Sequence, residues 1–342
     1  MLNDYKYVAE IPAAGNHAGN KARDDVDRIL SEVIGESIET YEEAIGFDCF
    51  IDKIKYILSM DNIRCMWRIF SCKNQNLIMQ YPFYCNFILR SILVRSLKKN
   101  NTCLIVHDVD SLRDFGDNRI SQEVELFNQC GKLIVHNQKM AKALKKLSVK
   151  TDMINLQVFD YLRDDCRVEN RELTNHIAFA GNLSKSKYLY HDLDKLGLIF
   201  NLYGPNYNED NIKSKCVSYK GSFPPNEIPQ KIEGSFGLIW DGSSITTCDG
   251  EFGRYMKYNN PHKLSLYISA KMPVIVWEEA AIADFVLKER IGFTIRKLAD
   301  INKIIENMSE DTYAMYIYNL DRLQKKVVKG YYTKKALMML EK

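Results

Sequence analysis

The sequence predicts an α/β fold with two doubly wound parallel sheets, one in each half of the chain. Short apolar runs rich in β-branched residues alternate with helical segments, which is typical of parallel strands joined by helices. The alternation occurs twice, on either side of a polar stretch from about Leu162 to Leu173. A chain of 342 residues is also longer than one ordinary core supports. We predict an N-terminal domain over residues 1–165 and a C-terminal domain over 172–325, with a terminal helix over 326–342 that packs back on the first domain.

The first half carries four predicted strands between helical segments. The strands are Tyr5 to Ile11, Asn76 to Tyr81, Thr102 to His107 and Lys132 to Asn137. The helices are Lys21 to Ile34, Phe47 to Met60, Phe83 to Asn101, Gln122 to Asn128 and Met140 to Leu147, and Ile63 to Phe70 is predicted as a buried segment.

The second half repeats the alternation with five predicted strands. They are Ile177 to Phe179, Ile199 to Gly204, Val217 to Gly221, Phe236 to Gly242 and Val274 to Trp277. The apolar spacing of Leu264 to Ile268 predicts a helix with one buried face before the last strand. Tyr313 to Leu340 is predicted to be helical with a break near Gly330.

Composition excludes several classes of protein. A net charge of +3 gives no footprint for nucleic acid. Nine cysteines without a C-x-x-C pair favour a reducing compartment over a disulfide scaffold or zinc ribbon. The sequence shows no signal-peptide pattern and no apolar run long enough to span a bilayer. We therefore expect a cytoplasmic protein.

The stretch from Asn259 to Trp277 predicts an anion-binding turn, because a polar loop, a helix and a buried strand follow one another there. Asn259 or Asn260 is expected to cap the helix. The helix N-terminus offers free N–H groups and the positive end of its dipole, and His262 and Lys263 add cationic or hydrogen-bond donor groups.

A second turn of this kind follows the predicted strand that begins near His176. Gly181 and Asn182 lead into a helix start that bears Lys185, and glycine lets a ligand approach the backbone closely. Each turn alone is also what an ordinary connection between strand and helix looks like. Two such turns in one α/β half fit a diphosphate.

Two features of the first half point to further contacts. The loop after the first strand consists of small residues, with Gly15, Asn16 and the titratable His17, but it lacks the G-x-G-x-x-G spacing of a dinucleotide site. Residues 83–99 form a basic amphipathic helix with Arg90, Arg95, Lys98 and Lys99 on one side. Such a helix can lie on an anionic membrane or be the solvated face of a packed helix.

Read in order, the motifs resemble a group of GT-B glycosyltransferases that holds bacterial β-1,6-galactofuranosyltransferases and the glucosyltransferases that extend O-linked GlcNAc on serine-rich adhesins. The motifs are F-A-G-N-L-x-K-S, L-Y-G, Y-K-G-S-F-P-x-x-E-I, F-G-L-I-W-D-G, N-x-P-H-K-L-S-x-Y-x-x-A-x-x-P-V-I-V-W and A-I-A-D-F-V, with H-D-x-x-x-L-R and I-V-H-N-x-x-M-x-x-x-L in the first half. The resemblance covers nearly the whole chain.

This resemblance implies two Rossmann-like domains that face a central cleft, with a UDP-sugar held mainly by the second. The positions that match the donor-binding motif are Asn182, Lys185, Asn259 and Lys263, and the loop around His17 would close over the sugar. We add neighbouring donor-site candidates from the same motifs and loops: Gly15, Asn16, Gly181, Tyr219, His262 and Asp284. The E-x₇-E pair of retaining relatives is replaced here by Tyr258 and Leu266, so the ribose contact stays open among Glu278, Glu279 and Asp284.

An inverting transferase needs a general base for the acceptor proton. Asp108, Asp110, Glu10 and His17 are candidates, and we favour Asp108, at the end of a strand, with His17 second. Asp108 could instead cap the following turn. The Asp108-Val109-Asp110 triplet also matches the metal-binding signature of the other large glycosyltransferase fold, GT-A, but the lysines already neutralise a diphosphate, so we expect no metal.

The resemblance does not decide whether the transferred sugar is galactofuranose or glucose. It also does not decide whether the glycan acceptor is linked to a lipid or to a protein. The basic helix would sit on the inner membrane face in the first case and serve as a subunit contact in the second, so a homo-oligomer stays open. A catalytically silent partner subunit is the alternative to an enzyme. The paired lysines argue against it, because a silent copy has no need of phosphate contacts.

Overall fold

The computed structural model describes residues 2, 4–11, 18–42, 54–55, 58–113, 117–168, 170–190, 193–209 and 214–341. These residues form two compact units. The first holds the described residues of 1–15, 22–156 and 333–342, and the second those of 16–21 and 157–332. The division assigns residues 157–165 to the second unit, whereas the sequence-based boundary groups them with the first.

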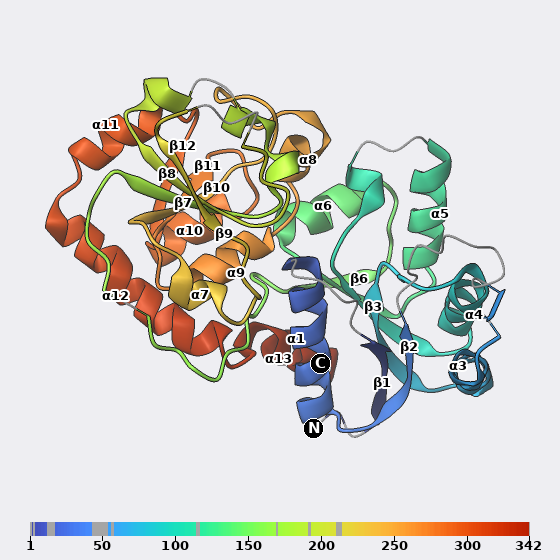
Figure 1. The fold of residues 1–342 in the computed structure, drawn as a ribbon. Coiled ribbons are helices and arrows are strands. Elements are labelled where there is room, and N and C mark those ends of the chain that lie inside the picture. Colours follow the sequence, from blue (N-terminus) through green and yellow to red (C-terminus); the bar gives the residue numbers. More distant parts are fainter. Residues whose placement is uncertain are drawn as a thin grey trace. The chain divides into compact units, whose positions relative to one another are not determined.

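The first unit is built on a six-stranded sheet with the order β2-β1-β3-β4-β5-β6, and all its strand pairs are parallel (Figure 1). The strands are β1 Tyr5–Ile11, β2 Ser37–Glu42, β3 Asn76–Tyr81, β4 Asn101–Val106, β5 Lys132–Val135 and β6 Asp152–Asn155. The helices are α1 Ala18–Val33, α3 Met60–Ser71, α4 Phe87–Leu97, α5 Asp117–Phe127 and α6 Gln138–Lys146, with the 3₁₀ turn η1 Asp110–Leu112.

The second unit has its own six-stranded parallel sheet, in the order β12-β11-β10-β7-β8-β9. The strands are β7 His176–Ala180, β8 Ile199–Tyr203, β9 Val217–Gly221, β10 Phe236–Ile239, β11 Val274–Trp277 and β12 Gly292–Ile295. The helices are α7 Ile228–Lys231, α8 Gly250–Tyr255, α9 His262–Ser269, α10 Ala283–Glu289, α11 Asp300–Glu306 and α12 Glu310–Val327, with 3₁₀ turns η2 Leu183–Lys185, η3 Lys187–Tyr190 and η4 Leu193–Leu196. The last two elements are α13 Tyr331–Met338, which begins in the second unit and continues in the first from Thr333, and η5 Met339–Glu341 of the first unit.

Tyr267 fixes helix α9 on the second sheet. Its ring lies over Gly237 of β10, where a Cβ atom would come within 2.5 Å of the ring, so only glycine fits there. Its hydroxyl accepts a hydrogen bond from the Ala180 N–H of β7 at 3.1 Å and donates to the Leu238 carbonyl of β10 at 3.2 Å. Helix α9 is thereby tied to two neighbouring strands at once.

All nine predicted strands are present, and strands β2, β6 and β12 were missed. Sequences such as S-I-E-T-Y-E and D-M-I-N are short and polar, so they lack the apolar run that marks a buried strand. The predicted break at Gly330 is confirmed, with a φ of +73° between α12 and α13.

Two local predictions are wrong. Ile63 to Phe70 is not a buried segment but part of helix α3, with Ile63, Trp67 and Phe70 exposed. Helix α9 is not buried on one face only, because every side chain from Leu264 to Ser269 is buried.

The predicted linker from Leu162 to Leu173 is anchored to the second unit by two arginines. Arg163 donates to the Ser269 carbonyl at 2.9 Å, and Arg171 donates to the carbonyls of Ala270, Ile232 and Gly234. These carbonyls lie at helix C-termini or in turns, where the backbone has no intrahelical donor. A polar sequence therefore does not mean a loose segment here.

None of the described helices is both long enough and apolar enough to cross a membrane.

Candidate functional site at the carboxyl edge of the second sheet

The strand order of the second sheet puts a topological switch point between β7 and β10, which makes its carboxyl edge the candidate site. Chain order reverses between these two strands, and open α/β sheets bind ligands outside the carboxyl ends of the strands at such a switch point. Gly237 pairs with Ala178 in register, so the turns after β7 and β10 leave the sheet side by side. Gly181 and Asn182 follow β7, and Asp241 follows β10.

Lys263 reaches this switch point from the first turn of α9. Its Nζ lies 2.6 Å from Asp241 Oδ1 and 4.6 Å from the centre of the Phe179 ring. A Cβ atom on Gly181 would lie 3.1 Å from Lys263 Cε, so the lysine stem runs along the Gly181 backbone. The structure thus brings together the two turns that the sequence singled out. Only 15% of the Lys263 side chain is exposed, so its charge acts where water screens it less than in bulk.

Close backbone packing supports the turn after β7. Gly204, after β8, has a φ of +131°, and a Cβ atom there would lie 2.0 Å from the Gly181 carbonyl oxygen. The Gly181 N–H donates to the Tyr203 carbonyl at 3.0 Å. A side chain at Gly204 would therefore displace the strand end that faces Lys263.

Asn182 acts as the cap of the 3₁₀ turn η2. Its Oδ1 accepts hydrogen bonds from Ser184 N at 3.1 Å, from Ser184 Oγ at 2.8 Å and from Asn206 Nδ2 at 3.0 Å. Lys185 is exposed, and its Nζ lies 4.9 Å from the centre of the Phe252 ring on α8. Asn182 thus shapes the turn, and Lys185 carries a positive charge beside it.

The loop before α9 does not cap the helix with an asparagine side chain, as the sequence predicts. Pro261 is the N-cap and makes no side-chain hydrogen bond, so the predicted capping by Asn259 or Asn260 is wrong. Asn260 Nδ2 instead donates to the Gln157 carbonyl at 2.8 Å. Asn259 Oδ1 is buried without a hydrogen-bond partner among the described residues. The first N–H groups of α9 therefore have no side-chain acceptor from the cap.

His262 is a packed aromatic residue and carries no charge at neutral pH. Its ring stacks on Tyr161, with 5.1 Å between ring centres and an angle of 22°, and its Nε2 lies 3.3 Å from the Asp160 carbonyl. Burial lowers the pKa of His262 to about 4. Of the two roles the sequence left open for it, hydrogen-bond donor or cation, only the first remains.

The other predicted donor-site residues lie on neighbouring elements. Tyr219 of β9 donates to the Gly204 carbonyl at 3.1 Å and stacks on Tyr207 with 4.2 Å between ring centres. Asp284 is exposed in the first turn of α10. Of the two glutamates that could replace it as ribose contacts, Glu279 pairs with Lys257 at 2.7 Å, and Glu278 lies 3.9 Å from Arg296.

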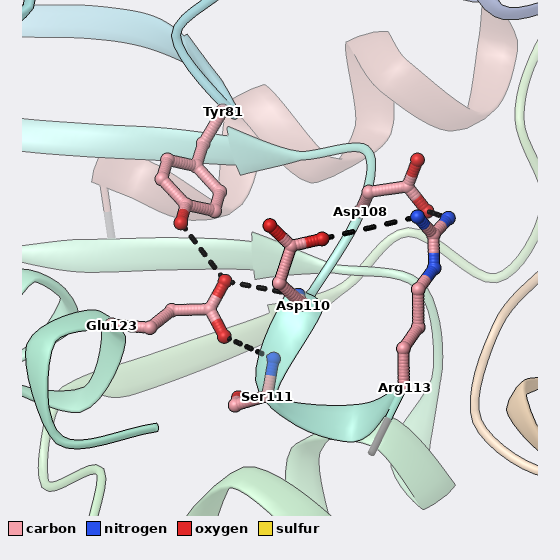
Figure 2. A network of polar contacts seen from close by, with 6 residues as sticks. All are labelled: Tyr81, Asp108, Asp110, Ser111, Arg113 and Glu123. Carbon is pink, nitrogen blue, oxygen red and sulfur yellow. Dashed lines mark hydrogen bonds and ion pairs between the residues drawn. The ribbon is translucent and has the colours of Figure 1, made fainter. Parts of the chain in front are cut away.

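Asp108 lies at the carboxyl end of β4 in the first unit, within a network of polar contacts (Figure 2). It forms an ion pair with Arg113, whose guanidinium also lies 3.8 Å from Asp110. The side chain of Asp108 is 29% exposed. Asp108 is therefore oriented by a cation while keeping access to solvent.

Buried Glu123 of α5 holds the turn that carries this triplet. Its carboxylate accepts hydrogen bonds from Asp110 N at 3.1 Å, from Ser111 N at 2.7 Å and from the Tyr81 hydroxyl at 2.9 Å (Figure 2). Burial and the nearby Glu123 carboxylate raise the pKa of Tyr81 well above its ordinary value, so Tyr81 stays protonated and donates. The Asp110 and Ser111 N–H groups of the turn thus donate to Glu123.

Gly15, Asn16 and His17 lie outside the described residues. In the described part of the chain, no three His, Cys, Asp or Glu side chains are grouped so that they could hold a metal ion.

Family models match both halves of the chain. The model described as "Glucosyltransferase 3-like, N-terminal domain" matches residues 5–158, and the corresponding C-terminal domain matches residues 177–340. The β-1,6-galactofuranosyltransferase WbbI of Escherichia coli strain K12 is 36% identical over 349 aligned residues, which cover 98% of this chain and 96% of WbbI. The chain belongs to the glucosyltransferase 3-like family.

More distant relatives agree with this placement. Glucosyltransferase 3 of Streptococcus gordonii is 23% identical over 68% of each chain. The solved α,α-trehalose-phosphate synthase (UDP-forming) of Burkholderia vietnamiensis superposes with a TM-score of 0.59 at 8% identity, over all of this chain and 99% of that one. This glucosyltransferase 3-like protein is thus a glycosyltransferase with the GT-B fold, and both predictions from the motif resemblance are confirmed.

Two residues that hold this candidate site in the glucosyltransferase 3-like protein were not predicted from the sequence. Asp241 directly contacts Lys263, and Tyr267 joins α9 to both strands of the switch point. The signal for Asp241 was present, because an acidic residue between Trp240 and Gly242 directly follows a buried strand. Tyr267 was marked only as a position of the quoted motif, and by itself an aromatic residue in an apolar helix looks like ordinary core.

Proposed function

We propose that this protein transfers a hexose from a UDP-sugar to a glycan acceptor, in the synthesis of a cell-surface polysaccharide or glycoprotein. Galactofuranose is the first candidate sugar, because WbbI matches 98% of the chain at 36% identity. Glucose is the second, because glucosyltransferase 3 matches 68% of it at 23% identity. UDP as the leaving group is supported by the motif resemblance and by the UDP-forming synthase that shares the fold.

The observation that carries the proposal is the position of Lys263 at the switch point, against Gly181 and paired with Asp241. A diphosphate between the Gly181 turn and the start of α9 would meet the Lys263 ammonium group and free backbone N–H groups. An ammonium group has three N–H donors, so Lys263 can keep its bond to Asp241 and still donate to phosphate oxygens. Negative charge grows on the diphosphate as the glycosidic bond breaks, so these groups stabilise the transition state more than the ground state.

On the acceptor side, we propose Asp108 as the general base, with His17 as the second candidate. Formation of a β linkage with inversion requires a group that takes the acceptor proton. Asp108 has the exposure and the oriented carboxylate that this role needs. We propose that Lys263 and Lys185 neutralise the diphosphate without a metal, and the expected result is sugar transfer that EDTA does not change.

A donor panel tests the proposal. Thermal stability is measured with UDP-galactofuranose, UDP-glucose, UDP-galactose and UDP-GlcNAc, and sugar release from each is followed. We expect one donor to raise the melting temperature and to be consumed. UDP binding with no release or transfer from any donor would favour a silent partner subunit. The absence of any UDP binding would remove the donor site itself.

We place the reaction in the cytoplasm, with the acceptor either lipid-linked or protein-linked. A lipid-linked acceptor would bring the protein to the inner membrane face, with residues 83–99 as the basic contact region.

A further inference from the structure

Helix α3 presents an apolar stripe to solvent. Its buried residues Asn62, Cys65 and Ile69 face the first unit. A second row on the same helix consists of exposed apolar residues: Met60 at 65%, Ile63 at 42%, Trp67 at 62% and Phe70 at 50%. The spacing of three, four and three residues puts this row on one side of the helix. A contiguous row of large apolar side chains in water marks an interaction surface, unlike a single exposed one.

Basic residues flank this stripe. Arg64 and Arg68 are exposed on the adjoining side of α3. Lys99, just after α4, lies with its Nζ 4.3 Å from the centre of the Phe70 ring. This contact joins the stripe to the basic side of α4, which packs beside α3 (Figure 1). Arg90 and Arg95 are exposed on that helix, and Lys98 is exposed at its C-cap.

The charge of this region differs in sign from that of the remaining chain. Residues 60–99 contain seven basic residues and one acidic residue, Asp61, hence a net charge of +6. The whole chain carries +3, so all other residues together carry −3. Positive charge is therefore concentrated in the segment of the chain that forms α3 and α4.

We propose that α3 and α4 form a surface that binds anionic lipid membranes peripherally. Tryptophan and phenylalanine prefer the boundary between lipid headgroups and acyl chains, and arginine and lysine are attracted to anionic headgroups. The basic amphipathic helix predicted from the sequence supplies only the charged half of this surface. Helix α3 supplies the apolar half, in Met60, Ile63, Trp67 and Phe70. The inference does not rest on the identity of the donor or acceptor.

The chain contains three tryptophans, and their burial makes the test direct. Trp67 is 62% exposed, whereas Trp240 and Trp277 are 0% and 2% exposed. Insertion of α3 into a membrane would shift the fluorescence of Trp67 to shorter wavelength and leave the other two unchanged. We expect this shift when the full-length protein meets vesicles of phosphatidylethanolamine with phosphatidylglycerol, and not with phosphatidylcholine alone. The Trp67→Phe variant should bind the same vesicles without the shift.

Cosedimentation with these vesicles gives the magnitude. The Trp67→Ser/Phe70→Ser variant is expected to bind at least about tenfold more weakly, since two large apolar side chains leave the interface. Reversal of Arg90, Arg95 and Lys98 to Glu should weaken binding by about fivefold per charge, and more at low salt.

Two control variants make the same kinds of substitution elsewhere on the surface: Tyr318→Ser at a 76% exposed aromatic residue, and Lys145→Glu/Lys146→Glu on α6. Both should bind like the unchanged protein.

Donor consumption and melting temperature show whether each variant is folded, and neither should change. Three results would overturn the proposal: no binding to anionic vesicles, equal binding to phosphatidylcholine, or equal loss of binding in the controls. A fourth result would also overturn it: the protein does not bind vesicles, but its mass in sedimentation velocity increases with concentration, and Trp67→Ser/Phe70→Ser abolishes this increase. That result would assign the stripe to a second copy of the chain.

Discussion

The carboxyl edges of the two sheets use their charged residues in different ways. At the second sheet, Lys263 lies against glycine backbone and, among the described residues, pairs with one carboxylate, that of Asp241. At the first sheet, Arg113 contacts two carboxylates, and the turn around them is closed by Glu123 (Figure 2). The second edge, which we call the cationic edge after Lys263, sets an ammonium group against glycine backbone, the arrangement that we propose for a diphosphate. The first edge is acidic and internally bonded, which suits orientation of a hydroxyl group.

The largest expected effect is at the acidic edge. Asp108→Asn removes the proposed base while keeping its size, and general-base catalysis contributes about 10²–10⁴-fold. We expect kcat to fall by that order with the KM for donor nearly unchanged, measured by transfer to a glycan acceptor. Asp110→Asn is the matched control, because Asp110 touches the same arginine and its side chain is 49% exposed. Equal losses in both variants would show that the carboxylates only hold the turn.

The cationic edge is tested by Lys263→Ala. Loss of one group that stabilises the developing charge typically lowers the rate by about 10²–10³. We expect kcat/KM for the UDP-sugar to fall by that order, with thermal stabilisation by UDP lost as well. Lys220→Ala is the control, since Lys220 pairs with Glu233 at 2.7 Å on β9 of the same unit. Unchanged turnover in Lys263→Ala would remove this lysine from the site.

The sequence predicted the fold and the two turns but not how they are held. Strands such as Val274–Trp277 are apolar runs that burial alone explains, so they were predictable. Lys263 was predicted because it adds a cation where the free N–H groups of a helix N-terminus already favour an anion. The partners that position it were not found, because Asp241 is 22 residues away in the chain and Tyr267 acts through contacts with two distant strands. Exposure of the α3 stripe was likewise missed, because periodicity shows that a row is apolar but not which side faces the core.

A smaller effect is expected from Tyr267→Phe, which alters the support of the cationic edge. The change leaves the buried Ala180 N–H without its acceptor, at a cost of about 1–3 kcal/mol. Each kcal/mol should lower Tm by about 2–4 °C for a unit of this size. Because Ala180 directly precedes Gly181, we also expect weaker UDP binding. Tyr313→Phe is the control, since its hydroxyl is also buried but bonds to the Ser235 carbonyl, before β10 begins. Tyr313→Phe should therefore lower the melting temperature without changing UDP affinity. If Tyr267→Phe and Tyr313→Phe bound UDP equally well, Tyr267 would have no role in the site.

The last expected effect is a pH dependence of stability that distinguishes the two units. Burial lowers the pKa of His136 in the first unit and of His262 in the second, each to about 4. The unfolded chain has the ordinary histidine pKa of about 6.5, so it binds more protons than the folded chain between pH 4 and 6.5. Stability from these neutral rings is therefore complete above about pH 6.5 and is lost as the pH falls towards 4.

Urea unfolding at pH 7 and pH 5 measures this loss in each unit, because Trp67 reports on the first unit and Trp240 and Trp277 on the second. His262→Gln should reduce the pH dependence seen by the buried tryptophans and leave that seen by Trp67. His136→Gln should do the reverse. If either variant changed the pH dependence seen by Trp67 and that seen by the buried tryptophans equally, the two units would unfold together. The difference between the two sheet edges would then have no counterpart in the stability of the units.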